Sequence, residues 1–170
     1  TESHTSRIGR HRIARHRGRL IKSTGDGVLV EFASVVDALG CAVEVQRTIA
    51  QRNAERGAGP RCEFRVGINL GDVLVDGSDL LGDGVNVAAR LQTLADPGGI
   101  LISGPVFDQV RDKLSLGFDY LGPQEVKNIA AEVPAYRVLL DSRSGPSRTA
   151  PRPDARQSNG PWQWLSSHTG

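Results

Sequence analysis

Apolar and polar residues alternate in two short segments near the start of the chain, residues 19–23 (RLIKS) and 28–32 (VLVEF). This alternation is typical of half-buried β-strands, whose side chains point to opposite faces in turn. The TGDG segment between them has the glycine and aspartate composition of a tight turn. The pattern therefore predicts a β-hairpin with Asp26 at its tip.

A long helical pattern follows this hairpin. Ser34 is a favourable N-cap residue, and Asp37, three residues later, gives the start of the helix the form of a capping box. The helix should end in the RGAGP segment, residues 56–60, because glycine and proline do not continue a helix. The apolar stripe predicted to face the core consists of Val36, Val43 and Ala50, widened by Leu39 and Ile49.

The rest of the chain continues to alternate strands and helices. Residues 64–68 alternate like a strand and should pair with a return strand that starts at Val73. Further elements are expected as helices at residues 85–96 and 105–114, a strand at 100–103, and a last hairpin from 118–128 and 134–140. This order predicts an α+β fold with helices packed on a mainly antiparallel, ferredoxin-like sheet. A ferredoxin-like unit begins with a strand and a helix, so the first strand is expected to be missing.

Composition divides the chain into three parts. Residues 19–140 carry the strands and helices and should form one folded domain. Residues 1–18 are rich in arginine and histidine; we expect a frayed, solvated arm, with contact to nucleic acid or anionic lipid as the alternative. Residues 141–170 are rich in proline, serine and arginine, which predicts a disordered tail. Trp162 and Trp164 in this tail fit either a short docking motif or an accidental sequence.

The sequence contains no apolar run long enough to span a membrane and no secretory pattern at its N-terminus. These features predict a soluble cytoplasmic protein. The two cysteines, Cys41 and Cys62, lack the spacing of metal ligands. They are expected to be buried thiols in a reducing compartment, with a single disulfide as the alternative.

One group of polar residues suits nucleotide chemistry. Asn86 and Arg90 are four residues apart, so they share one face of the predicted helix. The planar fork of an arginine fits phosphate oxygens, an amide fits a sugar oxygen, and Asp79 could accept from an exocyclic amine. The same spacing is also common on solvated surface helices. Taken alone, Lys22 fits a lysine that reaches from a strand to solvent, and Asp26 fits a turn residue.

Two motifs considered together favour the functional interpretation. The segment IKSTGDG, residues 21–27, and the later pattern D-x-x-G-x-x-V-N-x-A-x-R, residues 79–90, resemble the catalytic domain of class III nucleotide cyclases. The resemblance covers residues 16–138 and includes VGINLGDV at 66–73 and VKNIAAEVPAYRV at 126–138. It implies conversion of a nucleoside triphosphate into a 3′,5′-cyclic monophosphate and pyrophosphate. It also implies that two domains pair head to tail, as a homodimer or a heterodimer, and share the active sites.

The resemblance assigns roles to particular residues. Asp26 matches the second of two aspartates that hold two Mg²⁺ or Mn²⁺ ions. Lys22 and Asp79 match the pair that reads adenine from the partner protomer, which implies ATP as the substrate. Asn86 matches the residue that orients the ribose, and Arg90 matches the one that stabilises charge at the α-phosphate. Lys127 is the candidate for a further lysine that touches the triphosphate.

The sequence departs from the family pattern at its start. The family carries its first metal aspartate on its first strand, which this sequence does not contain, so Asp26 is expected to be the lone metal carboxylate. The central position of the sheet should then be unfilled, with unpaired backbone groups on both sides. We therefore expect an adenylate cyclase domain that is weak or inactive as an isolated chain.

Two alternatives belong to other functional classes. One is a catalytically silent nucleotide-binding or dimer-partner module, which lends Lys22, Asp79, Asn86 and Arg90 to a site completed by another chain. The other is a nucleic-acid-associated protein that uses the basic arm. It is the least favoured, because no aromatic residues for base stacking are interleaved with the arginines.

Overall fold

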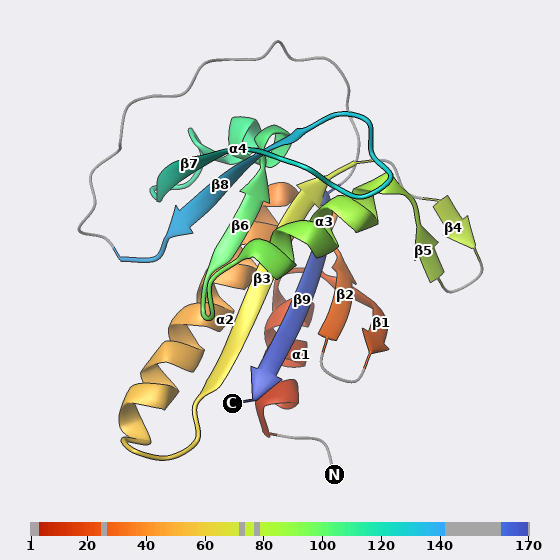
Figure 1. The fold of residues 1–170 in the computed structure, drawn as a ribbon. Helices are drawn as coiled ribbons and strands as arrows, with labels where there is room; N and C mark the ends of the chain where they lie inside the picture. Colours follow the sequence, from red (N-terminus) through yellow and green to blue (C-terminus); the bar gives the residue numbers. More distant parts are fainter. Residues whose placement is uncertain (1–3, 25–26, 72–73, 77–78, 142–160, 170) are drawn as a thin grey trace.

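Helices pack on both faces of a central β-sheet in the computed structural model (Figure 1). The structure describes residues 4–24, 27–71, 74–76, 79–141 and 161–169, and for residues 4–8, 24, 74–76, 79–81 and 161–169 it describes the backbone alone. Its elements are α1 (His4–Arg15), β1 (Arg19–Thr24), β2 (Gly27–Glu31), α2 (Val35–Glu55), β3 (Cys62–Leu70), β4 (Leu74–Asp76), β5 (Asp79–Leu81), α3 (Asp83–Leu94), β6 (Ile100–Ser103), α4 (Gly104–Val110), β7 (Gly117–Gln124), β8 (Val133–Leu139) and β9 (Pro161–Thr169).

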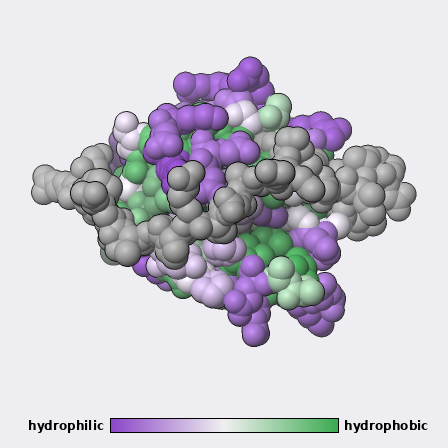
Figure 2. Space-filling view, turned by 90° about the horizontal axis from the view of Figure 1, so that it is seen from above, coloured by the Kyte–Doolittle hydropathy of each residue, from purple (hydrophilic) through white to green (hydrophobic). Residues whose placement is uncertain are grey.

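The main sheet has the strand order β1-β2-β9-β3-β6-β8-β7. Its neighbouring strands are antiparallel except for β3 and β6, which run parallel. One apolar core lies between the sheet and α1, α2 and α4, and a second lies under α3. The α+β class is therefore confirmed, with a mixed sheet. Seen from above, the described surface is mainly hydrophilic, with apolar areas between the polar side chains (Figure 2).

Both hairpins at the ends of the predicted domain are present. β1 pairs with β2, and β7 pairs with β8. The tip of the first hairpin, residues 25–26, lies outside the described residues. The predicted pairing of the strand at residues 64–68 with a return strand is wrong: β4 pairs with β5 in a separate two-stranded sheet. Both edges of β3 are already taken, one by β6 and the other by β9.

β9 fills the central position of the sheet. The expected gap in the sheet and the expected disorder of residues 161–169 are therefore both wrong. Every residue of β3 is paired with β9, and β2 pairs with β9 on its other edge. Two facing strand edges carry rows of backbone N–H and C=O groups that need partners. An extended segment between them satisfies both rows at once, which composition alone does not reveal.

The basic N-terminal segment is also ordered, so the expected frayed arm is wrong for residues 4–15, which form α1. Ile13 is buried in the core with 5% of its surface exposed. Arg12 and Arg15 form ion pairs with Glu44 of α2 at 3.2 and 3.1 Å, and His16 Nε2 lies 2.8 Å from the same carboxylate. The burial of Ile13 and the neutralisation by Glu44 hold α1 against α2.

The predicted start of α2 is confirmed, but its buried face differs from the predicted stripe. The Ser34 hydroxyl accepts a hydrogen bond from the Val36 backbone N–H. Asp37 accepts from Arg17 at 2.8 Å, an interaction outside a capping box. Leu39, Val43 and Ile49 are buried, as predicted, whereas Val36 is half-buried and Ala50 is exposed.

The described helices include none that is long and apolar enough to cross a membrane. Cys41 and Cys62 are free thiols, as expected, but only Cys41 is buried, whereas Cys62 is half-buried. Burial raises the pKa of Cys41 to about 12, so this thiol is protonated at neutral pH.

Candidate active site

Helix α3 carries the two residues of the second motif, and it is anchored to β3 at two levels. At its start, the buried Asn69 side chain donates a hydrogen bond from Nδ2 to the Gly84 carbonyl oxygen at 3.1 Å. One turn later the helix backbone passes directly over Gly67, where an added Cβ would lie 2.2 Å from the Ala88 carbonyl oxygen. Such a close approach is possible only for glycine. The height and rotation of α3 over the sheet are therefore fixed.

This rotation determines which side chains of α3 reach solvent. Val87 and Leu91 are buried in the core between α3, β6 and β8. Asn86 and Arg90 are exposed. The predicted sharing of one helix face by these two residues is thus confirmed, and that face is exposed.

Arg90 connects α3 to the segment between β7 and β8. Its Nε donates a hydrogen bond to the Glu125 carbonyl oxygen at 3.3 Å. Arg90 and Lys127 both line an open hollow of about 590 Å³ between α3 and residues 125–132. The structure therefore brings together the two cations expected at the phosphates, whereas their roles remain predictions.

The wall of this hollow is held by its own apolar residues. Val126 is buried beneath α3, and the Ile129 N–H donates to the Val126 carbonyl oxygen at 3.1 Å. Lys127 lies between them and is exposed. Glu125 and Glu132 also line the hollow, so an anionic ligand would meet two cations and two acids there. Sequence reasoning did not single out these two acids.

Two further predicted residues lie on strands β1 and β5. Lys22 lies on β1 and is exposed, and Asp79 is the first residue of β5. β5 lies against β1 and leads into α3 through Gly82 (Figure 1). The elements that carry Lys22, Asp79 and Asn86 are thus neighbours. Asp26 lies outside the described residues.

The fit of a divalent metal ion can be tested against the donor groups of the described residues. A hard cation such as Mg²⁺ prefers several carboxylate oxygens. Within the described ranges, no group of three or more His, Cys, Asp and Glu side chains is close enough to hold an ion. β9, which fills the central position, has no acidic residue in its sequence PWQWLSSHT. The described residues therefore do not form a two-metal site.

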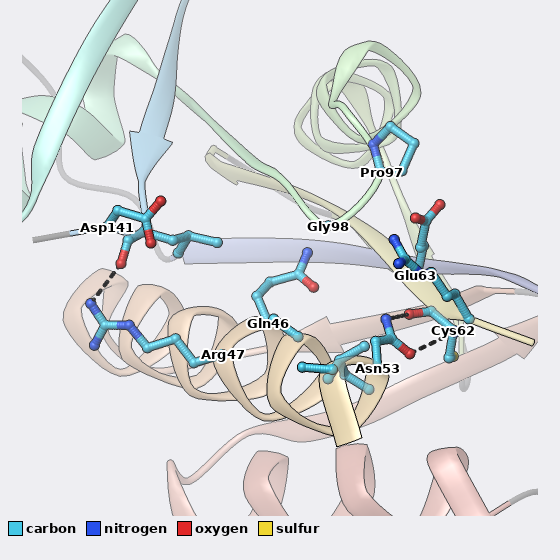
Figure 3. Close-up of a pocket in the computed structure, with 13 residues that line it drawn as sticks. Gln46, Arg47, Asn53, Cys62, Glu63, Pro97, Gly98 and Asp141 are labelled. Carbon is cyan, nitrogen blue, oxygen red and sulfur yellow. Dashed lines mark hydrogen bonds between the residues drawn. The ribbon is translucent and has the colours of Figure 1, made fainter. Parts of the chain in front are cut away.

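A second hollow, of about 510 Å³, lies at the start of β3 and shares no lining residue with the first (Figure 3). Gln46 of α2 donates from Nε2 to the carbonyl oxygens of Phe64 and Gly99, both at 2.9 Å. Asn53 accepts from the Cys62 N–H and donates to the Cys62 carbonyl oxygen. These amides tie α2 to the start of β3 and to the turn before β6, which is a structural role.

Comparison with known proteins decides the family. The model of the family described as "Adenylate and Guanylate cyclase catalytic domain" matches residues 8–139. The chain belongs to this family. It is a nucleotide cyclase catalytic domain by sequence and by fold. The expected resemblance is therefore confirmed, and it extends over α1 to β8.

Several individual relatives support the assignment. The chain is 49% identical over 118 residues to the protein named "Putative adenylate cyclase 3" from Rhizobium meliloti (strain 1021), covering 69% of this chain and 20% of that protein. It is 34% identical over 90 residues to an adenylate cyclase of Streptomyces coelicolor, covering 53% of this chain and 22% of the relative. The chain thus spans about a fifth of the length of these curated relatives.

Solved structures show the same fold. The adenylate/guanylate cyclase/hydrolase from Silicibacter pomeroyi matches with a TM-score of 0.75 at 37% identity over 79% of both chains. The adenylyl cyclase CyaB from P. aeruginosa matches with a TM-score of 0.66 at 22% identity, covering 82% of this chain and 80% of that one. The second likeness concerns the fold alone.

Proposed function

We propose that this cyclase domain converts ATP to 3′,5′-cyclic AMP and pyrophosphate. One observation carries the proposal: Asn86 and Arg90 are exposed on a rigidly anchored helix, and Arg90 borders the same hollow as Lys127. An amide for the ribose and two cations for phosphates are the groups that this reaction needs. The adenylate cyclase names of the Rhizobium and Streptomyces relatives support ATP as the nucleotide.

The reaction is an intramolecular phosphoryl transfer. The ribose 3′-oxygen attacks the α-phosphorus, a new O3′–P bond forms, and the bond from the α-phosphorus to the bridging oxygen of pyrophosphate breaks. The 3′-hydroxyl proton passes to water. Since little covalent chemistry falls to the protein, rate acceleration depends on positioning and on stabilising charge.

In this proposal each residue has one task. Asn86 orients the ribose so that its 3′-oxygen lies in line with the leaving pyrophosphate. Arg90 stabilises the negative charge that builds up around the α-phosphate, and Lys127 binds the triphosphate. Lys22 and Asp79 read the adenine ring, the lysine as a donor to a ring nitrogen and the aspartate as an acceptor from the amino group.

The family uses divalent metal ions, and Mg²⁺ or Mn²⁺ with Asp26 as a ligand is part of the proposal. Because the described residues do not form a two-carboxylate site, we propose weak or no activity for the isolated chain. The active unit is proposed to be a head-to-tail pair, either of two such chains or of this chain with another cyclase domain.

The test has two arms. In the first, the purified chain is incubated with ATP and Mn²⁺, and cyclic AMP is measured by mass spectrometry. In the second, the chain is mixed with a homologous domain that lacks its own asparagine and arginine at the positions equivalent to Asn86 and Arg90. Cyclic AMP in the first arm that is abolished by Arg90→Ala supports the proposal, whereas cyclic AMP in the second arm alone points to the dimer-partner role considered below. No cyclic AMP in both arms contradicts it.

A second function is favoured by one specific observation. The described residues offer no carboxylate cluster for metal ions but do present Asn86, Arg90 and Lys127. A module of this kind would complete the site of another cyclase domain without turnover of its own. Cyclic AMP in the mixture alone, with none from the isolated chain, would support this dimer-partner role.

A further inference from the structure

The place of β9 in the sheet has a consequence for assembly. β9 lies between β2 and β3, which are not neighbours in the strand order, and so it joins the β1–β2 hairpin to the rest of the sheet. Its register is continuous along both edges, from Gly27–Ser166 to Glu31–Trp162 on β2 and from Cys62–Thr169 to Leu70–Pro161 on β3. The β2 and β3 edges thus form a slot that takes one antiparallel strand.

β9 fills this slot, but the strand that precedes it in the chain, β8, lies far away in the sheet. In the sheet order, β8 lies three positions from β9, which is roughly 14 Å across the sheet. Arg137 of β8 pairs with Leu101 of β6, which pairs in turn with Gly67 of β3. The end of β8, two residues after Arg137, therefore lies near the level of Arg65 along β3. β9 begins at another level, opposite Leu70. The connection must therefore also rise by roughly 17 Å along the strands.

Residues 142–160 make this connection and are far longer than the distance requires. Fully extended, a segment of that length spans roughly 60 Å. The same segment can therefore reach the slot of a neighbouring molecule. The pairings with β2 and β3 would be identical in both arrangements, so the choice depends on chain entropy and on protein concentration.

We propose that the slot between β2 and β3 accepts its strand in trans, and that two copies of this chain exchange residues 161–169. Each copy would then complete the sheet of the other, a reciprocal strand swap. The partner is specified by chemistry: an extended segment with the sequence PWQWLSSHT, held mainly by backbone hydrogen bonds along both of its edges. The proposal concerns assembly and does not depend on turnover of ATP.

A native cysteine provides a direct test. Cys62 at the start of β3 is paired with Thr169 at the end of β9. Directly opposed residues in antiparallel strands have Cα atoms about 4.5–5.5 Å apart, within the range of a disulfide. Thr169→Cys in the full chain should therefore form a disulfide with Cys62. A swapped pair yields a covalent dimer, whereas an unswapped chain yields a covalent monomer.

The experiment refolds the Thr169→Cys chain under reducing conditions at a series of concentrations, oxidises it, and separates the products on a non-reducing gel. We expect a covalent dimer whose fraction rises at least several-fold over a hundredfold range of concentration. Peptide mapping of mixed isotope-labelled and unlabelled chains should then show Cys62 of one chain linked to the introduced thiol of the other. The control Thr169→Cys with Cys62→Ser should lose this linkage. A disulfide formed within single chains alone, or no disulfide at all, would overturn the proposal.

A shortened connection sharpens the result. Removal of residues 142–159 leaves roughly 14 Å of extended chain between Leu139, the last residue of β8, and Pro161, too little for the path to the chain's own slot. In this variant, with Thr169→Cys, every disulfide between Cys62 and the introduced thiol should join two chains, so the oxidised product should be covalent dimer with no linkage within a single chain. If it stays monomeric in light scattering and still links Cys62 to the introduced thiol within one chain, exchange does not occur.

Discussion

Arg90 is exposed and yet held in place. Its Nε is bonded to the Glu125 carbonyl oxygen, while the side chain as a whole faces solvent. A guanidinium held at one nitrogen loses less conformational freedom when it binds an anion than an unrestrained one. This restraint favours a role in binding phosphate over that of an incidental surface charge.

Replacement of Arg90 tests this role. We expect Arg90→Ala to lower kcat by roughly 100- to 1000-fold, because a positioned charge at a developing anion is lost. Arg90→Lys should retain part of the rate, since it keeps the charge without the planar fork. The measurement is cyclic AMP production in whichever arm of the assay is active. Arg56→Ala, an exposed arginine at the end of α2, is the matched control. Equal effects of Arg90→Ala and Arg56→Ala would refute the assignment.

Lys22 is the residue proposed to select the base. Lys22→Glu should reduce the preference for ATP over GTP by about tenfold or more, because a carboxylate accepts a hydrogen bond where the ammonium donates. The ratio of kcat/KM for the two nucleotides measures this preference. An unchanged ratio, in an assay that gives product, would count against the assignment. A lysine outside the site, Lys113, provides the control as Lys113→Glu.

Glu44 links acid stability to the docking of α1. Its pKa is lowered by the hydrogen bond with His16 and by the charges of Arg15 and Arg12. A lowered folded-state pKa means that this contribution is present above the ordinary carboxyl pKa and is lost as pH falls through the folded value. Glu44→Gln should cost roughly 1 kcal/mol at pH 7.

The pH dependence distinguishes this ion-pair effect from general damage. Urea unfolding at pH 7 and at pH 3.5 should show a smaller loss of stability on acidification for Glu44→Gln than for the unchanged chain. Glu55→Gln, on the same helix and bonded only to the nearby Gln51 in the described region, should behave like the unchanged chain. Identical acid sensitivity of all three proteins would exclude the proposed linkage.

At the level of elements, the approach of α3 to β3 over Gly67 sets the geometry of the site. Gly67→Ala would place a Cβ 2.2 Å from the Ala88 carbonyl oxygen and 2.4 Å from the Gln92 nitrogen, both backbone atoms. The helix would have to move, so we expect a loss of about 2 kcal/mol or more in the free energy of unfolding. A displaced α3 also carries Asn86 and Arg90 away, which should lower activity further in the folded protein.

A second glycine supplies the control for this prediction. Gly9 in α1 has no atom within 4 Å of an added Cβ. Gly9→Ala should therefore leave activity unchanged and raise stability by up to about 1 kcal/mol, because alanine is the better helix former. Chemical denaturation of the two variants side by side makes the comparison. Similar stability changes in both would show that backbone contact at Gly67 is not the cause.

The elements that the sequence predicted well have their signals close together in the chain. The β1–β2 hairpin surrounds a Gly/Asp turn, and α2 begins at the Ser34 cap. The elements that were missed depend on distant partners. α1 needs Glu44 on another helix, and β9 needs two strand edges far away in sequence. No local pattern contains such information.

The candidate site shows the same division. The spacing of Asn86 and Arg90 was enough to place them on one face of the helix. The contact between Arg90 and the Glu125 carbonyl was not predictable, because it joins α3 to a segment that follows β7. The buried Asn69 that fixes the start of α3 also lacked a signal, since an asparagine in a strand pattern does not reveal its partner.

At the scale of the whole molecule, a shared active site makes activity depend on concentration. If two domains contribute to each site, the specific activity should rise with chain concentration until the pair is saturated. Measurements from nanomolar to micromolar chain, with the variant Arg90→Ala as the blank, would show this rise. A constant specific activity over that range, with the protein monomeric in light scattering, would contradict a shared site.

The position of β9 also orders the events of folding. Its pairs with β2 join residues from opposite ends of the chain, and such distant contacts form slowly because a very large loop must close first. Until that closure, the first hairpin and the α2–β3 unit are separate bodies with open strand edges, which are prone to aggregate. Recovery of native protein from denaturant should therefore depend less on the early formation of helices than on how dilute the chains are when the last strand arrives.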